Sequence, residues 1–267
     1  MRTLLEVSLY FFIYAFLGWV CESIYCSIGN NKIINRGFLN GPICPVYGFG
    51  ALIVIFFLDN HQDSIIEIFM YGLILTSILE YTTGYLLETI FNTTWWDYSD
   101  EKYNLKGRVC IKNSILFGLM SVILMEVIHK IILNLVASIP LLLIIFLVAS
   151  SIVLLVIDLS FTVISMNKLN TKLKSLECII KELKNINIHL DQFDDVNLNH
   201  LFDILKNKGD LKSEKVDDII NKILNIRLKS TNQRRIIKAF PNMKHKHHHD
   251  ILLNLKQIIK KKGNMNK

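Results

Sequence analysis

The chain has 267 residues, of which 51% are hydrophobic and 20% are charged, and its formal net charge is +7. Residues 1–166 hold 8 Lys and Arg against 12 Asp and Glu, whereas residues 167–267 hold 22 against 11. This asymmetry predicts a membrane-embedded first part and a basic second part exposed to water. Nucleic-acid binding is the other use of a basic tail, but beside a membrane domain we expect contact with anionic lipids and no nucleic-acid partner.

Cysteine usage and motif searches indicate no metal, cofactor or nucleotide site. The five cysteines include no CxxC pair, and four of them lie in or beside apolar segments, where cysteine acts as a small hydrophobic residue. The sequence has no HExxH, no GxSxG and no GxxxxGK[ST] phosphate loop, so we expect no ATP hydrolysis by that route. Residues 244–250, KHKHHHD, could hold a metal, but we expect them to be a solvated basic segment.

Five segments are apolar enough to cross a membrane, which needs about 20 residues of helix. They are residues 4–25, 42–58, 65–91, 111–128 and 140–164. Residues 129–138, between the last two, are expected to form an interfacial turn of helix. The first segment has no small-residue cleavage site after it, so we expect an uncleaved span rather than a signal peptide.

Basic residues in the short loops predict the orientation of these spans. Lys32 and Arg36 follow the first span, three basic residues follow the third, and a strongly basic region follows the fifth. The loop after the second span has none. We therefore expect the N-terminus outside and the C-terminus in the cytoplasm, in a plasma membrane.

The predicted membrane domain contains a repeat at an offset of 66 residues. Residues 18–25, GWVCESIY, correspond to residues 84–91, GYLLETIF, and residues 39–44 correspond to 105–110 without a gap. With five spans, both copies run in the same direction. The sequence thus predicts a parallel repeat of two helix pairs, about residues 4–58 and 65–128, rather than an inverted repeat.

After the fifth span, apolar residues at spacings of three and four predict a continuing helix with a coiled-coil seam. The seam positions are Met166, Leu169, Leu173, Leu176, Ile180 and Leu183, followed by Asn187 and Leu190. Packing within the chain and dimerisation are both open explanations. Further helices are expected at residues 213–228, after a capping Ser213, and at residues 251–262, after a capping Asp250.

Glutamates inside the predicted spans are the first candidates for function, because an ionisable group there costs about 2.5–3.5 kcal/mol on insertion scales. Glu22 lies one helical turn after Gly18, and Glu88 lies one turn after Gly84. A glycine at such a position allows a neighbouring helix to approach closely. We therefore expect Glu22 and Glu88 to face a shared interior near the cytoplasmic end, with Glu80 on the same polar stripe of the third span.

Arg36 and Arg108 flank these helices and are the natural partners of the acids, since a guanidinium binds a carboxylate or a phosphate. Two interpretations remain: ion pairs that fix the helix bundle, or a polar cavity that binds a polar or anionic group such as a lipid headgroup. No catalytic residue is singled out. The candidate cavity residues, from the spans and from the loops that follow them, are Glu22, Asn35, Arg36, Asn40, Tyr47, Glu80, Tyr81, Glu88, Trp96, Asp97, Tyr98, Asn104 and Arg108.

Several short patterns carry a family resemblance. They are Gly18-Trp19 with Glu22, residues 35–42 (NRGFLNGP) with Pro45 and Tyr47-Gly48, Glu80-Tyr81 with Glu88, and residues 96–98 (WDY) with Asn104-Leu105, Gly107-Arg108, Cys110 and Ser114. Over roughly residues 5–160 the chain resembles a bacterial family labelled putative ABC transporter permease, type IV, also called CmpB-like. The resemblance implies a permease that needs a separate ATPase, and it supplies neither a substrate nor a reaction.

The sequence as a whole predicts an all-α polytopic integral membrane protein. Residues 1–166 would form five transmembrane helices, the fifth at about 140–164, and residues 167–267 a helical cytoplasmic tail. One candidate function is a permease-type transport component, possibly a homo-oligomer, with a polar cavity open to the cytoplasm and no ATPase of its own. The alternatives are a membrane-embedded enzyme acting on lipid-linked or cell-envelope substrates, and a scaffold that recruits partners through the basic tail.

Overall fold

The computed structural model describes residues 2–30, 34–58, 64–185, 231–253 and 255–256. It is mostly helical, as the sequence predicts, with four two-residue strands in addition. The chain divides into two compact units. The membrane unit comprises Met1–Ile90 and Trp95–Thr162, and the second unit comprises Phe91–Thr94 and Val163–Lys267.

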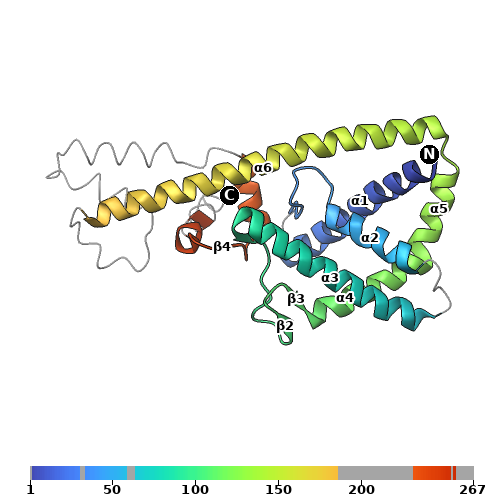
Figure 1. Cartoon of the computed structure of the whole chain (residues 1–267), viewed down its shortest axis with the longest axis horizontal. Coiled ribbons are helices and arrows are strands. Elements are labelled where there is room, and N and C mark those ends of the chain that lie inside the picture. Colours follow the sequence, from blue (N-terminus) through green and yellow to red (C-terminus); the bar gives the residue numbers. More distant parts are fainter. Residues whose placement is uncertain (1, 31–33, 59–63, 186–230, 254, 257–267) are drawn as a thin grey trace. The chain divides into compact units, whose positions relative to one another are not determined.

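The membrane unit is built from apolar helices joined by short loops (Figure 1). Its elements are α1 (Arg2–Asn30), α2 (Pro45–Leu58), α3 (Ile65–Phe91), α4 (Ile111–Ile123), the π-helical turn η1 (Leu124–Ile128), α5 (His129–Ala137) and the first part of α6 (Leu141–Asn185). Two short strands, β2 (Asn104–Leu105) and β3 (Val109–Cys110), form an antiparallel pair after α3.

Four helical segments are long and apolar enough to cross a membrane: Arg2–Ile28, Ile65–Phe91, Ile111–Ala137 and Leu141–Ile179. The third of them joins α4, η1 and α5, so residues 129–137 extend the fourth predicted span instead of forming a separate interfacial turn. Helix α2 has 14 residues, or about 21 Å at 1.5 Å per residue, which is short of a hydrocarbon core of about 30 Å.

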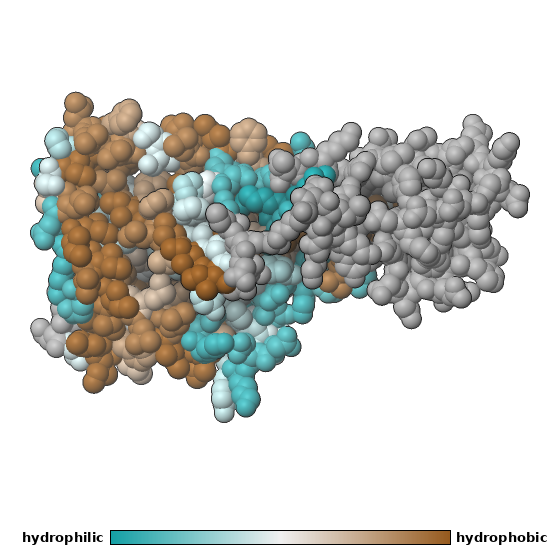
Figure 2. Space-filling view, turned by 180° about the vertical axis from the view of Figure 1, so that it is seen from behind, coloured by the Kyte–Doolittle hydropathy of each residue, from teal (hydrophilic) through white to brown (hydrophobic). Residues whose placement is uncertain are grey.

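The outer surface of the membrane unit is apolar. Figure 2 shows hydrophobic residues covering its helices, with hydrophilic residues gathered at the edges. Large side chains such as Phe56, Leu142 and Phe146 are exposed on it. Large exposed apolar surface is unfavourable in water and favourable against lipid. We conclude that these helices lie in a membrane.

Two groups of buried residues hold the helices together. The first joins α1, α2, α5 and α6, and the second joins α2, α3 and η1. The first consists of Leu9, Tyr14, Ala51, Ile132, Val136, Ile144 and Val148, and the second of Val54, Leu58, Ile68 and Met125.

Glycines mark the closest helix contacts, as expected where lipid gives no hydrophobic drive to association. A Cβ on Gly48 of α2 would lie 2.7 Å from the Phe11 carbonyl oxygen of α1. A Cβ on Gly118 of α4 would lie 2.8 Å from the Phe69 ring of α3. Each contact brings two helix backbones together, so neither glycine can be enlarged without moving a helix.

The second unit packs its C-terminal segment on α6. Helix α9 (Thr231–Ala239) follows α6 among the described elements, and β4 (Lys244–His245) pairs with β1 (Thr93–Thr94). Met166, Leu169, Leu173 and Leu176 of the predicted seam are buried within the single chain, as are Ile236, Ile237 and Ala239 of α9. The Asn232 and Gln233 amides donate to Ser165 at 3.0 and 3.2 Å.

Packing within the chain therefore accounts for the burial of these seam positions. The expected continuation at Asn187 and Leu190, and the expected helix at residues 213–228, lie outside the described residues. Residues 249–253 and 255–256 are helical. Asp250 is thus already inside the last helix rather than its cap.

We predict that Gly48→Ala destabilises the membrane unit by about 1–3 kcal/mol, because the added methyl group meets the Phe11 backbone oxygen, which can move only with α1. Gly50→Ala is the matched control on the same helix. Its Cβ would lie 3.3 Å from the end of the flexible Leu79 side chain. Thermal unfolding in detergent should show a lower midpoint for Gly48→Ala alone, and equal midpoints for the two variants would contradict this packing.

Candidate functional site

Two carboxylates from different spans belong to what we call the Glu22–Glu80 cluster, which also contains Arg36, Tyr47 and Tyr98. The Tyr47 hydroxyl donates to Glu22 Oε2, and Arg36 Nε lies 3.5 Å from Glu22 Oε1. The Tyr98 hydroxyl donates to Glu80 Oε1 at 3.1 Å. Burial raises the pKa of Tyr98, and the negative charges of Glu80 and Glu22 raise it further. The charges of both acids thus raise the pKa of the same group, the Tyr98 hydroxyl.

One oxygen of this cluster has no hydrogen-bond partner within the part of the chain that the structure describes. Glu80 Oε2 is buried and accepts no hydrogen bond. An unsatisfied buried polar atom costs about 1–3 kcal/mol, and more when the group is charged. The cluster holds two carboxylates against one guanidinium. A ligand that donates a hydrogen bond would satisfy this oxygen, and a positively charged ligand would also balance the excess negative charge.

The loop at residues 34–44 brings Arg36 to the cluster. The Asn35 side chain shapes this loop: its Oδ1 accepts from Trp19 Nε1 at 2.9 Å and from Gly37 N at 3.1 Å, and its Nδ2 donates to Asn40 O at 2.8 Å. The ring of Tyr47, which follows the loop, occupies the space over Gly18. Asn35 therefore positions the cluster rather than joining it.

Asp158 of α6 anchors the same loop, although it is not among the candidate residues chosen from the sequence. Its Oδ1 accepts from Asn40 N at 2.9 Å and from Asn40 Nδ2 at 3.0 Å, and its Oδ2 accepts from Gly41 N at 2.7 Å. A carboxylate in an apolar span is itself the signal that could have identified it. Asn40 is the loop's point of attachment to α6.

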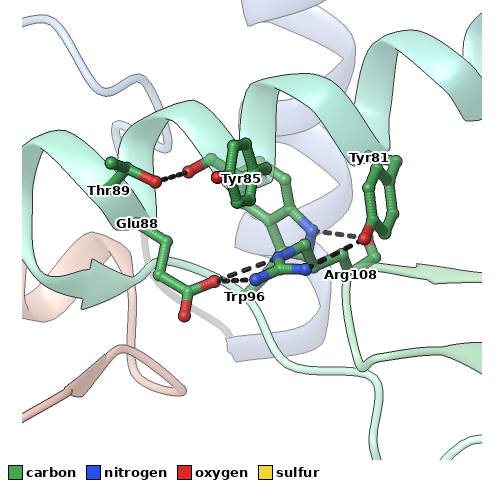
Figure 3. Close-up of polar contacts among 6 residues, drawn as sticks. All are labelled: Tyr81, Tyr85, Glu88, Thr89, Trp96 and Arg108. Carbon is green, nitrogen blue, oxygen red and sulfur yellow. Dashed lines mark hydrogen bonds and ion pairs between the residues drawn. The ribbon is translucent and has the colours of Figure 1, made fainter.

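The second group, the Glu88–Arg108 cluster, is an ion pair enclosed by aromatic rings (Figure 3). Arg108 Nε and Nη2 donate to Glu88 Oε2 at 3.0 and 2.6 Å, and Nη1 donates to the Tyr81 hydroxyl at 3.2 Å. The guanidinium carbon lies 5.3 and 5.4 Å from the ring centroids of Tyr81 and Tyr85, within range of cation–π attraction. The bond to Glu88 raises the pKa of Arg108.

The loop at residues 95–110 presents Arg108 to α3. Trp96 Nε1 donates to the Arg108 carbonyl oxygen at 2.9 Å, and the Trp96 ring lies against Gly84. Asn104 Nδ2 donates to two carbonyl oxygens of the loop, and its Oδ1 accepts from Gly107 N, where φ is +67° and glycine is favoured. Asp97 Oδ1 accepts from Ser99 N at 2.9 Å. Asp97 and Asn104 thus shape the loop.

In the structure, the candidate residues divide into the two clusters and a set of residues that shape the loops. The two loops also meet, with the rings of Phe38 and Trp95 in an edge-on contact at 4.9 Å. Glu80, rather than Glu88, is the acid whose charge acts with that of Glu22 on one hydroxyl, while Glu88 binds Arg108. The Glu22–Glu80 cluster holds Glu22, Arg36, Tyr47, Glu80 and Tyr98, the Glu88–Arg108 cluster holds Tyr81, Glu88, Trp96 and Arg108, and the loop-shaping residues are Asn35, Asn40, Asp97 and Asn104.

The comparisons with known proteins bear on this same region. A model of the family described as "Putative ABC-transporter type IV" matches residues 9–163, which include both clusters and Asp158. The chain belongs to this family. The family resemblance seen in the sequence is thus confirmed, together with the membrane location. Neither a curated protein nor a solved structure matches the chain.

The histidine-rich stretch lies in the second unit, and its first histidine is packed rather than solvated, so the prediction of a solvated segment is wrong for His245. This residue is only 5% exposed, because β4 pairs with β1. Its Nδ1 accepts from His247 N and His248 N at 3.2 and 3.1 Å, and His248 Nδ1 lies 3.0 Å from Glu177 Oε2 of α6. No arrangement of metal-binding residues is found in the described ranges.

We predict that Glu88→Gln lowers the stability of the membrane unit by about 1–3 kcal/mol, below the ~3–5 kcal/mol of fully buried pairs, because the side chains of Arg108 and Glu88 are 15% and 24% exposed. Glu101→Gln, which breaks the exposed pair with Lys112, is the matched control and should cost less than about 1 kcal/mol. Thermal unfolding in detergent measures both. Equal losses would mean that the Glu88–Arg108 pair is not buried as described.

We predict that acid loosens the C-terminal segment. Burial, and then the charges of His248 and His247, lower the pKa of His245 to about 4. The unfolded segment, with an ordinary pKa near 6.5, binds a proton that the folded one does not. Stability is therefore intact above pH 6.5 and falls from there toward pH 4, by up to about 1.4 kcal/mol per pH unit.

Hydrogen exchange of residues 231–256, measured from pH 7 to pH 4, tests this prediction after correction for the intrinsic rate. His245→Asn should reduce the acid sensitivity, whereas His247→Asn at an exposed position should retain it. A segment equally protected at pH 7 and pH 4.5 would contradict the prediction.

Proposed function

We propose that the chain is a permease-type transport component and that the Glu22–Glu80 cluster binds the polar part of its substrate at the cytoplasmic side of the membrane. Membership of the ABC-transporter-type family supports transport. The observation that carries the proposal is the buried Glu80 Oε2, which accepts no hydrogen bond from the described residues.

The groups in the cluster define the chemistry of the ligand. Glu80 favours a donor such as a hydroxyl or an ammonium group, and the Arg36 guanidinium favours a carboxylate or a phosphate. The two tyrosine hydroxyls already donate to the acids. We infer a substrate whose polar part carries an ammonium group for Glu80 and an anionic group for Arg36, so that it adds no net negative charge to the cluster, as in zwitterionic lipid headgroups.

We further propose that the membrane unit is a parallel repeat of two helix pairs, in which the short helix α2 also spans the membrane and brings the number of spans to five. The contact of Phe11 with Gly48 joins the helices of the first pair, and a hydrogen bond of 2.7 Å between Ser77 and Ser114 joins those of the second. The two contacts lie one repeat apart, since both residues of the first are 66 positions before those of the second. In each copy an aromatic ring covers the glycine before the acid, Tyr47 over Gly18 and Trp96 over Gly84, although these two rings do not stand at equivalent positions of the repeat. These correspondences support the repeat.

The orientation and partners follow from the same proposal. With the N-terminus outside, both loops face the cytoplasm and carry the basic residues of the short connections, as the positive-inside rule requires. The chain has no phosphate loop, so a separate ATPase would supply ATP hydrolysis. The basic second unit would contact anionic lipids, and a homo-oligomer would provide a full permease with a sufficient number of spans.

We predict that Glu80→Gln strongly reduces transport while the protein still inserts. Loss of a charged hydrogen bond of about 1.5–3 kcal/mol weakens binding roughly ten- to hundredfold. A deletion strain would be complemented with wild type, Glu80→Gln or Glu126→Gln, and its lipids and metabolites compared by mass spectrometry. Glu126, which pairs with the exposed Lys130, is the matched control on another span and should restore the wild-type composition.

Affinity purification of the same three proteins should recover an ATPase with each of them. Full complementation by Glu80→Gln would contradict the proposed site. Accumulation of a chemically altered lipid, without an ATPase, would favour the enzyme, and loss of the phenotype on deleting residues 167–267 alone would favour the scaffold.

A further inference from the structure

A histidine lies in the interior of the membrane unit, away from both clusters. His129, at the start of α5, is 6% exposed, and Tyr14 of α1 is 3% exposed. The Tyr14 hydroxyl and His129 Nδ1 are 2.7 Å apart. Tyr14 is close to the middle of the span Arg2–Ile28. Ionisable residues at such positions are uncommon, and they mark ion and proton pathways more often than other intramembrane residues do.

An irregular turn of helix precedes this histidine and sets the direction of its side chain. The π-helical turn η1, Leu124–Ile128, ends directly before His129. One additional residue in a turn rotates everything that follows by about 100°, and such turns are frequent at functional sites. After η1, His129 and Ile132 face the core, while Lys130 is exposed and pairs with Glu126.

Tyr14 belongs to a series of residues at four-residue spacing that winds around α1 by about 160° from Glu6 to Glu22. Glu6, Tyr10, Tyr14, Gly18 and Glu22 recur at every fourth position. The Tyr10 ring lies 5.8 Å from the His129 ring, and Tyr47, which covers Gly18, donates to Glu22. Groups that exchange protons therefore occur on α1 from its first turns to the Glu22–Glu80 cluster.

Among the described residues, few charged groups lie near His129. From α1 it faces the ring of Tyr10 and the hydroxyl of Tyr14, with Glu6 one turn before Tyr10 and paired with Arg2. On its own helix the nearest charges are Glu126 and Lys130, which neutralise each other. The other members of the buried group around Tyr14 are apolar: Leu9, Ala51, Ile132, Val136, Ile144 and Val148.

We propose that His129, with Tyr14 as its partner, is a proton-binding site in the interior of the membrane. In the neutral imidazole with hydrogen on Nε2, Nδ1 accepts the Tyr14 proton in a hydrogen bond. Protonation forms an N–H bond at Nδ1, and the Tyr14 hydroxyl turns to accept from it. The proton comes from hydronium, which becomes water, and the tyrosine keeps its own proton throughout.

A proton bound here would let a proton gradient contribute to transport. This consequence rests on the proposed function, whereas the proton-binding site does not. Coupling sites of secondary transporters lie near the bilayer midplane, as Tyr14 does in its span.

The site is tested by titrating the full-length chain, labelled with ¹⁵N-histidine, in lipid vesicles between pH 5 and pH 9. The imidazole resonance that disappears in His129→Gln belongs to His129. We expect it to change from the neutral to the imidazolium pattern within this range, because the Tyr14 hydroxyl beside Nδ1 can accept a hydrogen bond from the imidazolium, whereas Nδ1 of His245 faces backbone N–H groups that only donate. Tyr14→Phe should lower the midpoint by about one pH unit, or 1.36 kcal/mol, because the hydrogen bond that the imidazolium loses is charge-assisted and stronger than the one that the neutral ring loses.

Ser114→Ala is the matched control, since it removes another buried hydrogen bond, to Ser77, between two helices of the same unit. It should leave the midpoint unchanged. If His129→Gln does not fold, the one resonance that Tyr14→Phe displaces provides the assignment. A His129 resonance that stays neutral from pH 5 to pH 9, or no resonance displaced by Tyr14→Phe, overturns the proposal. The titration needs no substrate and no ATPase, so it can fail or succeed independently of transport.

Discussion

The arrangement of the membrane unit depends on the cost of placing carboxylates in apolar helices. Each acid in a span must find hydrogen-bond donors or cations, because neither lipid nor apolar side chains can supply them. Both loops at the polar end of the unit meet this demand. Residues 34–44 bring Arg36 to Glu22 and backbone amides to Asp158, and residues 95–110 bring Tyr98 to Glu80 and Arg108 to Glu88. The acids thus determine where the loops lie.

Much of this could be predicted from sequence, since the cost of a buried charge is a local property. Long apolar segments identify the spans, glutamates within them identify the acids, and arginines in the next loop identify their partners. The division of roles between Glu80 and Glu88 could not be predicted in this way. Eight residues correspond to about 800° of helical rotation, so the two side chains point about 80° apart, and which neighbour each one meets depends on how the helices pack.

Other features depend on contacts between residues far apart in the chain. Asp158 lies 118 residues after Asn40, and His129 lies 115 residues after Tyr14. The π-helical turn that orients His129 leaves no clear pattern in an apolar segment, and the two-residue strand of His245 exists only because Thr93–Thr94 is present to pair with it. Such features require the tertiary structure, because no local preference specifies them.

The two clusters differ in how completely their charges are satisfied, and this difference argues for distinct roles. Glu88 and Arg108 neutralise each other, and aromatic rings enclose the guanidinium, so this pair acts as a fixed joint between α3 and its loop. Glu22 is paired with Arg36, whereas one buried oxygen of Glu80 accepts no hydrogen bond from the described residues. An uncompensated acceptor lowers stability without holding anything in place. It persists where a ligand or a proton supplies the missing partner, and for that reason the function is best sought at Glu80.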